Sequence, residues 1–202
     1  MREKDHTGNM LYIIRHGQTE LNTKMLMQGR SDHPLNDTGY AQAEEAAKRL
    51  AGMGIRIDKI YSSPLVRAIA TARKIAPDTE ITIDERLIEM DYGPYEGMDL
   101  RNPAPEVLEF FGDFVNVPAP AGMEPLHAVV ERLGNLLKEI KEEAASSNVL
   151  LSTHAIAMKG ALEYLTPDSH GSYWSKYIGN CDIYAADVKD GKYTVPVCLK
   201  DE

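Results

Sequence analysis

The stretch MLYIIRHG, residues 10–17, decides the fold of this 202-residue chain. Residues 10–14 are all apolar and rich in strand-forming side chains, which predicts a buried strand. Arg15, His16 and Gly17 follow at once, so we expect this strand to end in a loop that carries a cation and an imidazole. A second strand-like run, residues 149–153 (VLLST), is followed directly by His154. The sequence therefore predicts two histidines at the ends of two buried strands.

Helical and strand-like segments alternate along the rest of the chain. Apolar residues at helical spacing predict helices at about 37–54 with an N-cap at Asp37-Thr38, at 63–75 with Ser63 as N-cap and Pro64 as first residue, at 125–140 with Pro125 in the first turn, and at 155–165. Short strands are expected at 59–61, 81–83, 183–188 and 193–199. This order predicts an α/β fold, a three-layer αβα arrangement with a mainly parallel central sheet. Ligands bind such sheets beyond the carboxyl ends of the strands.

An irregular segment, residues 91–121, interrupts this alternation. It contains two Pro-Ala-Pro-type stretches and the three phenylalanines of the chain, Phe110, Phe111 and Phe114, which stand with Val107 at helical spacing. We interpret it as a small lid subdomain. The expected organisation is one domain over residues 1–202 with a lid insertion at about 91–121.

Composition narrows the classes of function. The 22 Lys and Arg residues and 31 Asp and Glu residues give a net charge of −9, which argues against a nucleic acid or an anionic membrane as partner. No apolar signal segment follows Met1 and no run is long enough to span a membrane, so we expect a cytoplasmic protein. Cys181 and Cys198 suggest neither a disulfide framework nor a zinc cluster.

The other histidines do not suggest a metal site. No two of them lie four apart, as a metal-binding pair on a helix would, and we expect surface positions for His6, His33, His127 and His170. We predict no metal and no cofactor.

Phosphoryl transfer suits the predicted sheet edge. Neutral imidazole is a good nucleophile for phosphorus, and a transferring phosphoryl group needs several convergent cations and donors. His16 can supply the first, while Arg15, His154 and the helical Arg67 can supply the others. Each of these residues alone also fits an ordinary role: a histidine bonded to backbone at a strand end, or an arginine on a helix surface.

Five segments, in order, resemble the histidine phosphatase superfamily, the phosphoglycerate-mutase-like proteins. They are residues 15–20 (RHGQTE) with Asn22, 28–39 (QGRSDHPLNDTG), 62–68 (SSPLVRA), 89–97 (EMDYGPYEG) and 152–155 (STHA). By this resemblance His16 is the nucleophile that becomes phosphorylated, and Arg15, Arg67 and His154 bind the phosphoryl group. Glu89 then donates a proton to the leaving alcohol and activates water, so we expect burial or a substrate anion to keep its carboxyl protonated.

The resemblance also implies a phosphate pocket completed by Asn22, Gln28 and the Gly29 backbone, with a backbone donor at Ala155. Ala155 stands where the family usually has glycine, and Tyr95 where it usually has tryptophan. Asp182 places a carboxylate where the family commonly has a hydroxyl, so the resemblance does not predict the role of that edge of the pocket.

The lid bears on the leaving group. Residues 91–131 hold one cation, Arg101, and eight acids: Asp91, Glu96, Asp99, Glu106, Glu109, Asp113, Glu124 and Glu131. Acids facing the substrate would repel a second phosphate or carboxylate, and the phenylalanines would favour an apolar or uncharged body. The alternative is that the aromatic rings pack inward on the core.

The resulting hypothesis is a phosphomonoester hydrolase of the histidine acid-type, acting through a phosphohistidine on a small-molecule phosphate ester and releasing inorganic phosphate. The alternatives are a cofactor-dependent phosphoglycerate mutase, an alpha-ribazole phosphate phosphatase, and a non-catalytic phosphate-binding module. The sequence leaves a homodimer open.

Overall fold

The computed structural model describes residues 10–199 and contains a central sheet of six strands in the order β3-β2-β4-β1-β5-β8. The strands β1 (Leu11–Arg15), β4 (Val149–Thr153), β2 (Lys59–Ser62) and β3 (Ile81–Ile83) are parallel, while β5 (Ile183–Ala186) and β8 (Val197–Leu199) add an antiparallel edge. Every residue of β4 is buried, Ser152 and Thr153 included, as expected for a strand covered on both faces.

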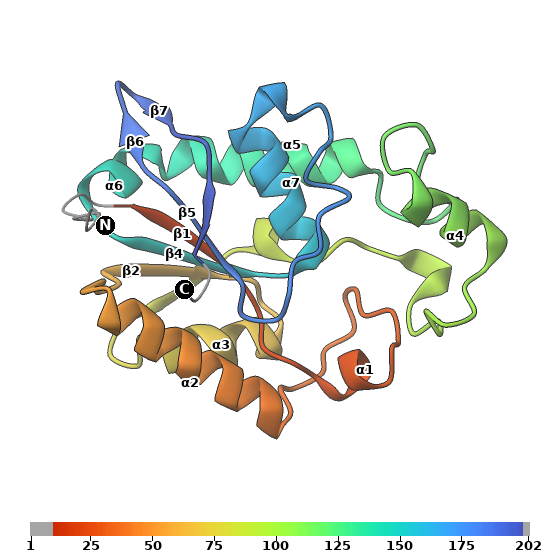
Figure 1. Cartoon of the computed structure of the whole chain (residues 1–202), viewed down its shortest axis with the longest axis horizontal. Helices are drawn as coiled ribbons and strands as arrows, with labels where there is room; N and C mark the ends of the chain where they lie inside the picture. The colour runs from red at the N-terminus through yellow and green to blue at the C-terminus, as the bar shows by residue number, and fades with distance from the viewer. Residues whose placement is uncertain (1–9, 200–202) are drawn as a thin grey trace, which may run out of the picture.

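Helices cover both faces of this sheet (Figure 1). On one side lie α2 (Asp37–Gly52) and α3 (Val66–Ile75), and on the other lie α5 (Leu126–Glu139), α6 (Lys141–Ser146) and α7 (Ala155–Leu165). Alternate residues of β1 enter different cores: Leu11 and Ile13 pack with α5 and α7, and Tyr12 and Ile14 pack with α2. The predicted three-layer α/β fold is confirmed.

Three predicted helix starts were wrong. The N-cap of α2 is Asn36, whose side-chain oxygen accepts the Gly39 amide at 2.8 Å. Helix α3 begins at Val66 without a side-chain cap, because the Ser63 side chain is turned toward the sheet edge. Pro125 precedes α5 as its N-cap residue. A propensity pattern cannot show that a capping side chain has a stronger partner elsewhere.

Several short elements are absent from the prediction. Helix α1 (Glu20–Thr23) lies in the expected loop and begins with a capping box between Thr19 and Asn22. The expected strands 183–188 and 193–199 are divided, because β6 (Val188–Lys189) and β7 (Lys192–Tyr193) form a separate hairpin. The turns η1 (Glu85–Leu87), η2 (Gly93–Tyr95) and η3 (Pro167–Ser169) complete the described chain.

The segment 91–121 carries η2 and α4 (Pro105–Gly112), at an end of the molecule apart from the helices that cover the sheet (Figure 1). Val107 and Phe110 are fully buried in the core that includes α5, whereas Phe111 and Phe114 are half-buried. All three phenylalanines thus pack on this core: Phe110 lies inside it, and Phe111 and Phe114 pack against it while partly exposed.

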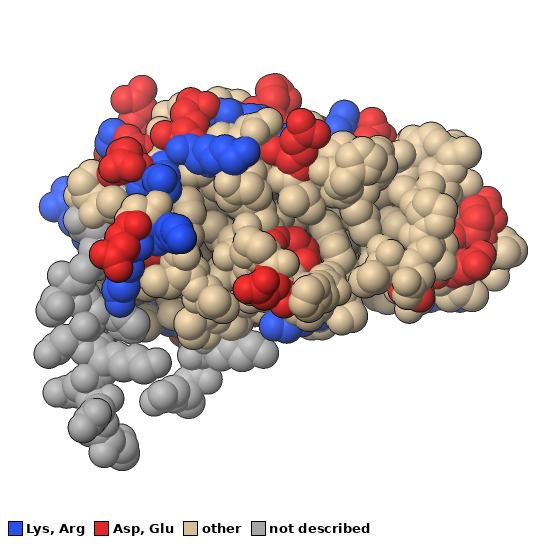
Figure 2. All heavy atoms as spheres, turned by 90° about the horizontal axis from the view of Figure 1, so that it is seen from above, with Lys and Arg blue, Asp and Glu red and all other residues tan. Residues whose placement is uncertain are grey.

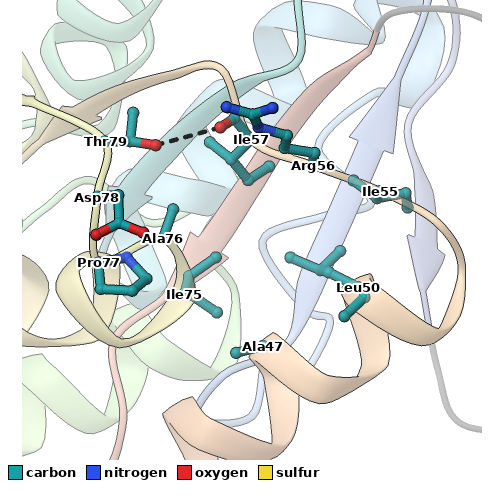
Figure 3. Close-up of a pocket in the computed structure, with 11 residues that line it drawn as sticks. Ala47, Leu50, Ile55, Arg56, Ile57, Ile75, Ala76, Pro77, Asp78 and Thr79 are labelled. Atoms are coloured by element: carbon teal, nitrogen blue, oxygen red, sulfur yellow. Dashed lines mark hydrogen bonds between the residues drawn. The ribbon is translucent and has the colours of Figure 1, made fainter.

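A hollow of about 330 Å³ lies between the C-terminal ends of α2 and α3, at the edge of the sheet where β2 begins (Figure 3). Its lining is mainly apolar, with Arg56 and Asp78 among its residues, and it includes none of the predicted site residues. Within residues 10–199, no helix has the length and apolar character needed to cross a lipid bilayer.

Candidate active site

The two predicted histidines lie side by side at the carboxyl ends of β1 and β4. These strands pair in parallel with Arg15 opposite Thr153, and the His16 amide donates to the Thr153 carbonyl at 2.9 Å. As a result, the ring centroids of His16 and His154 are 5.1 Å apart. His16 and His154, which are far apart in the sequence, therefore lie together at the predicted edge of the sheet.

His16 is held as a neutral imidazole. Its Nδ1 lies 2.6 Å from the Gly17 carbonyl, and because a carbonyl only accepts hydrogen bonds, Nδ1 carries the proton. The Nε2 lone pair is then free. Burial, with the charges of Arg15 and Arg67, holds the pKa of His16 well below 6.5. This is the protonation state that a nucleophile requires.

Arg67 lies behind His16 and orients the second histidine. Its guanidinium is fully buried and donates to the carbonyls of Ser31 at 2.8 Å and Gly29 at 2.6 Å. Its Nε donates to His154 Nδ1 at 3.2 Å, so the His154 proton lies on Nε2, which donates to Ser63 Oγ at 2.8 Å. Burial and Arg67 lower the pKa of His154 well below 6.5. Arg67 thereby determines the tautomer of His154.

A cavity of about 500 Å³ opens in front of His16. Two nitrogens of residues that line it, Arg15 Nε and Gln28 Nε2, are buried and have no hydrogen-bond partner among residues 10–199. Arg15 Nη1 is fixed on the Ile178 carbonyl at 2.6 Å, and the Gln28 amide is oriented by Thr19 Oγ1, which donates to its oxygen at 2.8 Å. Buried donors without acceptors cost free energy, so this arrangement is suited to an incoming anion.

Glu89 lies in the same cavity with its carboxylate at the start of α7. Its two oxygens accept three backbone amides: Met90 at 2.8 Å, Ala157 at 2.9 Å and Ile156 at 3.1 Å. Backbone donors at a helix N-terminus stabilise the ionised carboxylate. These three amides take the place of the water that burial removes from the carboxylate.

The predicted site residues divide into two groups. Arg15, His16, Asn22, Gln28, Glu89 and Ala155 line the cavity. Gly29, Arg67 and His154 lie behind it. The Gly29 amide donates to the Glu96 carboxylate at 2.9 Å, and Gly29 does not line the cavity, so a role of its backbone in phosphate binding stays a prediction. A Cβ at Gly29 would lie 2.5 Å from Glu96 Oε2, so close packing is the reason for glycine here.

Other polar residues of the site were missed from the sequence. Glu96 also accepts from the Ser31 side chain, and so holds the loop whose carbonyls bind Arg67. The Asn180 side chain donates to the His16 carbonyl at 3.0 Å. Lys159 lines the cavity, and its position one helical turn after Ala155 is the signal that could have revealed it.

The questionable edge at residues 180–182 is closed by a turn. Asp182 accepts the Gly179 amide at 2.6 Å and does not line the cavity. Its carboxylate therefore does not oppose a bound anion by contact.

The expected repulsion from the lid was wrong. None of the eight acids of residues 91–131 lines the cavity. Six of them have partners elsewhere: Asp91 with Arg30, Glu96 with Gly29, Asp99 with Arg101, Glu106 with Tyr95, Asp113 with Asn116 and Glu124 with Arg132. Figure 2 shows acidic side chains on the outer surface of the end that carries α4. The cavity instead contains Lys159 and Lys176.

The remaining histidines are away from the site. His127 and His170 are exposed and His33 is half-buried, while His6 lies outside the described residues. Across residues 10–199, no three His, Cys, Asp or Glu side chains are grouped as metal ligands.

Comparison with known proteins agrees with this geometry. The family model of the histidine phosphatase superfamily (branch 1) matches residues 11–199. The chain belongs to the histidine phosphatase superfamily. It is an enzyme of this superfamily, and the resemblance predicted from the sequence is confirmed.

Two curated superfamily members illustrate the range of relatives. Phosphoserine phosphatase 1 of Hydrogenobacter thermophilus is 30% identical over 170 residues, 82% of this chain and 80% of the relative. The 2,3-bisphosphoglycerate-dependent phosphoglycerate mutase of Methylobacterium sp. (strain 4-46) is 31% identical, covering 77% and 80%. Among solved structures, the Entamoeba histolytica phosphoserine phosphatase in complex with 3-phosphoglyceric acid aligns with a TM-score of 0.82 and 28% identity, covering 96% of this chain and 98% of that one.

Proposed function

We propose that the chain hydrolyses small-molecule phosphomonoesters through a phosphohistidine on His16, as a histidine acid-type phosphatase. One observation carries the proposal: a neutral imidazole with a free Nε2 shares a cavity with two buried, unpartnered donors, Arg15 Nε and Gln28 Nε2. A nucleophile for phosphorus beside donors for its equatorial oxygens is the arrangement that phosphoryl transfer requires.

The reaction has two steps. His16 Nε2 attacks phosphorus, the bond to the ester oxygen breaks, and the departing oxygen takes a proton from the Glu89 carboxyl. Glu89 then takes a proton from water, whose oxygen attacks phosphorus, and the phosphorus–nitrogen bond breaks to release inorganic phosphate. Glu89 must be protonated for the first step, and we infer that the dianionic ester bound beside it supplies the necessary field.

The residues behind the cavity support these steps. Arg67 contributes a buried positive charge close to His16 and fixes the His154 ring. Asn22 accepts the Thr19 amide at 3.1 Å through its side-chain oxygen, which leaves its amide group for the phosphoryl group. We assign Arg15, Gln28 and Asn22 to phosphate binding, and Arg67 and His154 to positioning and charge.

We infer in addition that residues 91–121 act as a lid within a single domain, because Phe111 and Phe114 of this segment line the cavity. A cytoplasmic location remains a prediction from the sequence.

The test is hydrolysis of 4-nitrophenyl phosphate. Wild-type protein should release nitrophenol, His16→Ala should lose this activity by a factor of about 10³ or more, and His127→Ala, at an exposed histidine, should retain it. Full activity in His16→Ala would refute the assignment. A mutase is distinguished by assaying 3-phosphoglycerate with and without its bisphosphate primer, which should give no isomerisation.

A further inference from the structure

The cavity extends well beyond the space around His16. Its volume of about 500 Å³ lies in the range of small-molecule pockets, about 300–1,000 Å³. Besides His16, its lining includes aromatic rings from three segments: Tyr92, Phe111 with Phe114, and Trp174 with Tyr177. The cavity must also hold the leaving group of the phosphate ester. The chemistry of its lining therefore determines the class of substrate.

Lys159 is a charged residue among these aromatic rings. It lies on α7 one turn after Ala155, is half-buried and lines the cavity. Its Nζ donates to the Trp174 carbonyl at 2.7 Å and lies 5.3 Å from the centroid of the Phe114 ring. Among residues 10–199, no carboxylate forms a salt bridge with this ammonium, although an ammonium has three donors.

This position is unfavourable for a lysine that lacks a ligand. Lysine side chains usually keep the charged group in water, whereas burial lowers the pKa of Lys159 to about 8 against the opposing charge of Glu89. A role limited to anchoring the Trp174 carbonyl would leave two donors unused in the cavity. An anionic group on a ligand would use them and compensate the cost of burial.

The charges of the cavity agree with such a ligand. Its lining contains the cations Arg15, Lys159 and Lys176, and the one carboxylate is Glu89. Arg15 lies beside the nucleophile, and the Glu89 carboxylate already accepts three backbone amides. Lys159 is therefore available to bind an anionic group on the leaving group. Lys176 lies on the exposed rim, with Nζ 4.2 Å from the Tyr173 ring centroid.

We propose that Lys159 binds a second anionic group, a carboxylate or a phosphate, on the leaving group of the substrate. The preferred substrates are then phosphomonoesters that carry a negative charge on an apolar body. This inference rests on the proposed phosphatase function and adds the substrate class.

The experiment compares phenyl phosphate with 3- and 4-carboxyphenyl phosphate and with 1,3-phenylene bisphosphate. The measured quantity is the ratio of kcat/KM for each anionic ester to that for phenyl phosphate. The ratio for the wild type should exceed that for Lys159→Gln by about 10-fold for at least one anionic ester, the effect of one charge-assisted hydrogen bond. Comparing the two proteins cancels the intrinsic reactivity of each ester. The better anionic ester distinguishes a carboxylate from a phosphate.

The variants separate charge from structure. Lys159→Gln keeps an amide donor for the Trp174 carbonyl, Lys159→Met removes it, and Lys159→Arg should restore the preference. The matched control is Lys138→Met, at an exposed lysine 5.7 Å from the Tyr164 ring centroid, which should keep the wild-type ratio. Equal ratios in wild type and Lys159→Gln would overturn the proposal, as would a lower melting temperature without a change in the ratio.

Binding measurements keep the two proposals distinct. Dissociation constants of the same esters, measured by calorimetry on His16→Ala and on His16→Ala with Lys159→Gln, should show the same loss of preference without turnover. Absence of hydrolysis by the wild type would refute the phosphatase, while these constants would still decide the role of Lys159.

Discussion

Replacement of Arg67 by lysine should damage both stability and the active site, because this fully buried guanidinium makes three hydrogen bonds. Its partners are the carbonyls of Gly29 and Ser31 and His154 Nδ1. Burial lowers the pKa of Arg67 to about 10, so the group remains charged at neutral pH. A lysine ammonium can reach about one of these acceptors and leaves two without a donor. At about 1–3 kcal/mol for each unsatisfied buried group, the free energy of unfolding should fall by about 2–6 kcal/mol.

Two assays follow this change. Urea unfolding measures the free energy of unfolding. The ¹⁵N chemical shifts of His154 report its tautomer, and in the variant the proton should no longer be held on Nε2. We also expect kcat to fall by about 10² because the loop of residues 29–31 and the His154 ring are displaced. Arg73→Lys, an exposed arginine of the same helix, is the matched control. An Arg67→Lys protein within about 1 kcal/mol of wild type, with His154 still protonated on Nε2, would refute this reasoning.

Three further predictions concern the ionisable groups. The pKa values of His16 and His154 are lowered in the folded protein, so the unfolded chain binds more protons below pH 6.5. The free energy of unfolding should therefore fall on acidification by up to about 2.7 kcal/mol per pH unit. Unfolding curves for His16→Asn, measured over the same pH range, should show roughly half this slope. Glu89→Gln should lower kcat by about 10²–10⁴ for an alkyl phosphate and much less for 4-nitrophenyl phosphate, whose leaving group needs no proton; equal losses would remove Glu89 as proton donor. The preference for anionic esters in kcat/KM should disappear as pH rises through about 8, where Lys159, facing Glu89, Arg15 and Lys176, loses its charge; a preference constant to pH 10 would contradict this.

The sequence predicted the sheet and its edge because hydrophobic patterning determines them. The runs at 11–15 and 149–153 are buried strands in parallel register, and this register alone brings His16 beside His154. Helix α7, which begins directly after β4, was predicted from the same alternation. These features depend on local pattern and on general rules of strand connection.

Features set by tertiary hydrogen bonds could not be predicted in the same way. The direction of the Arg67 guanidinium depends on two carbonyls in a loop more than thirty residues away, and that loop depends on Glu96. The three backbone amides around the Glu89 carboxylate depend on where α7 begins relative to this loop, and the sequence alone does not show that contact. The acidic lid misled for a related reason: composition gives the charges of a segment but not the direction in which they point.

The account depends most on covalent chemistry at His16. Rapid quench of the wild-type enzyme with ³²P-labelled substrate, followed by peptide mapping, should trap a phosphoryl group that is labile in acid, stable in alkali and attached to His16. Label formed in His16→Ala at the wild-type level, or hydrolysis at the wild-type rate with no phosphoenzyme trapped at any time, would contradict it.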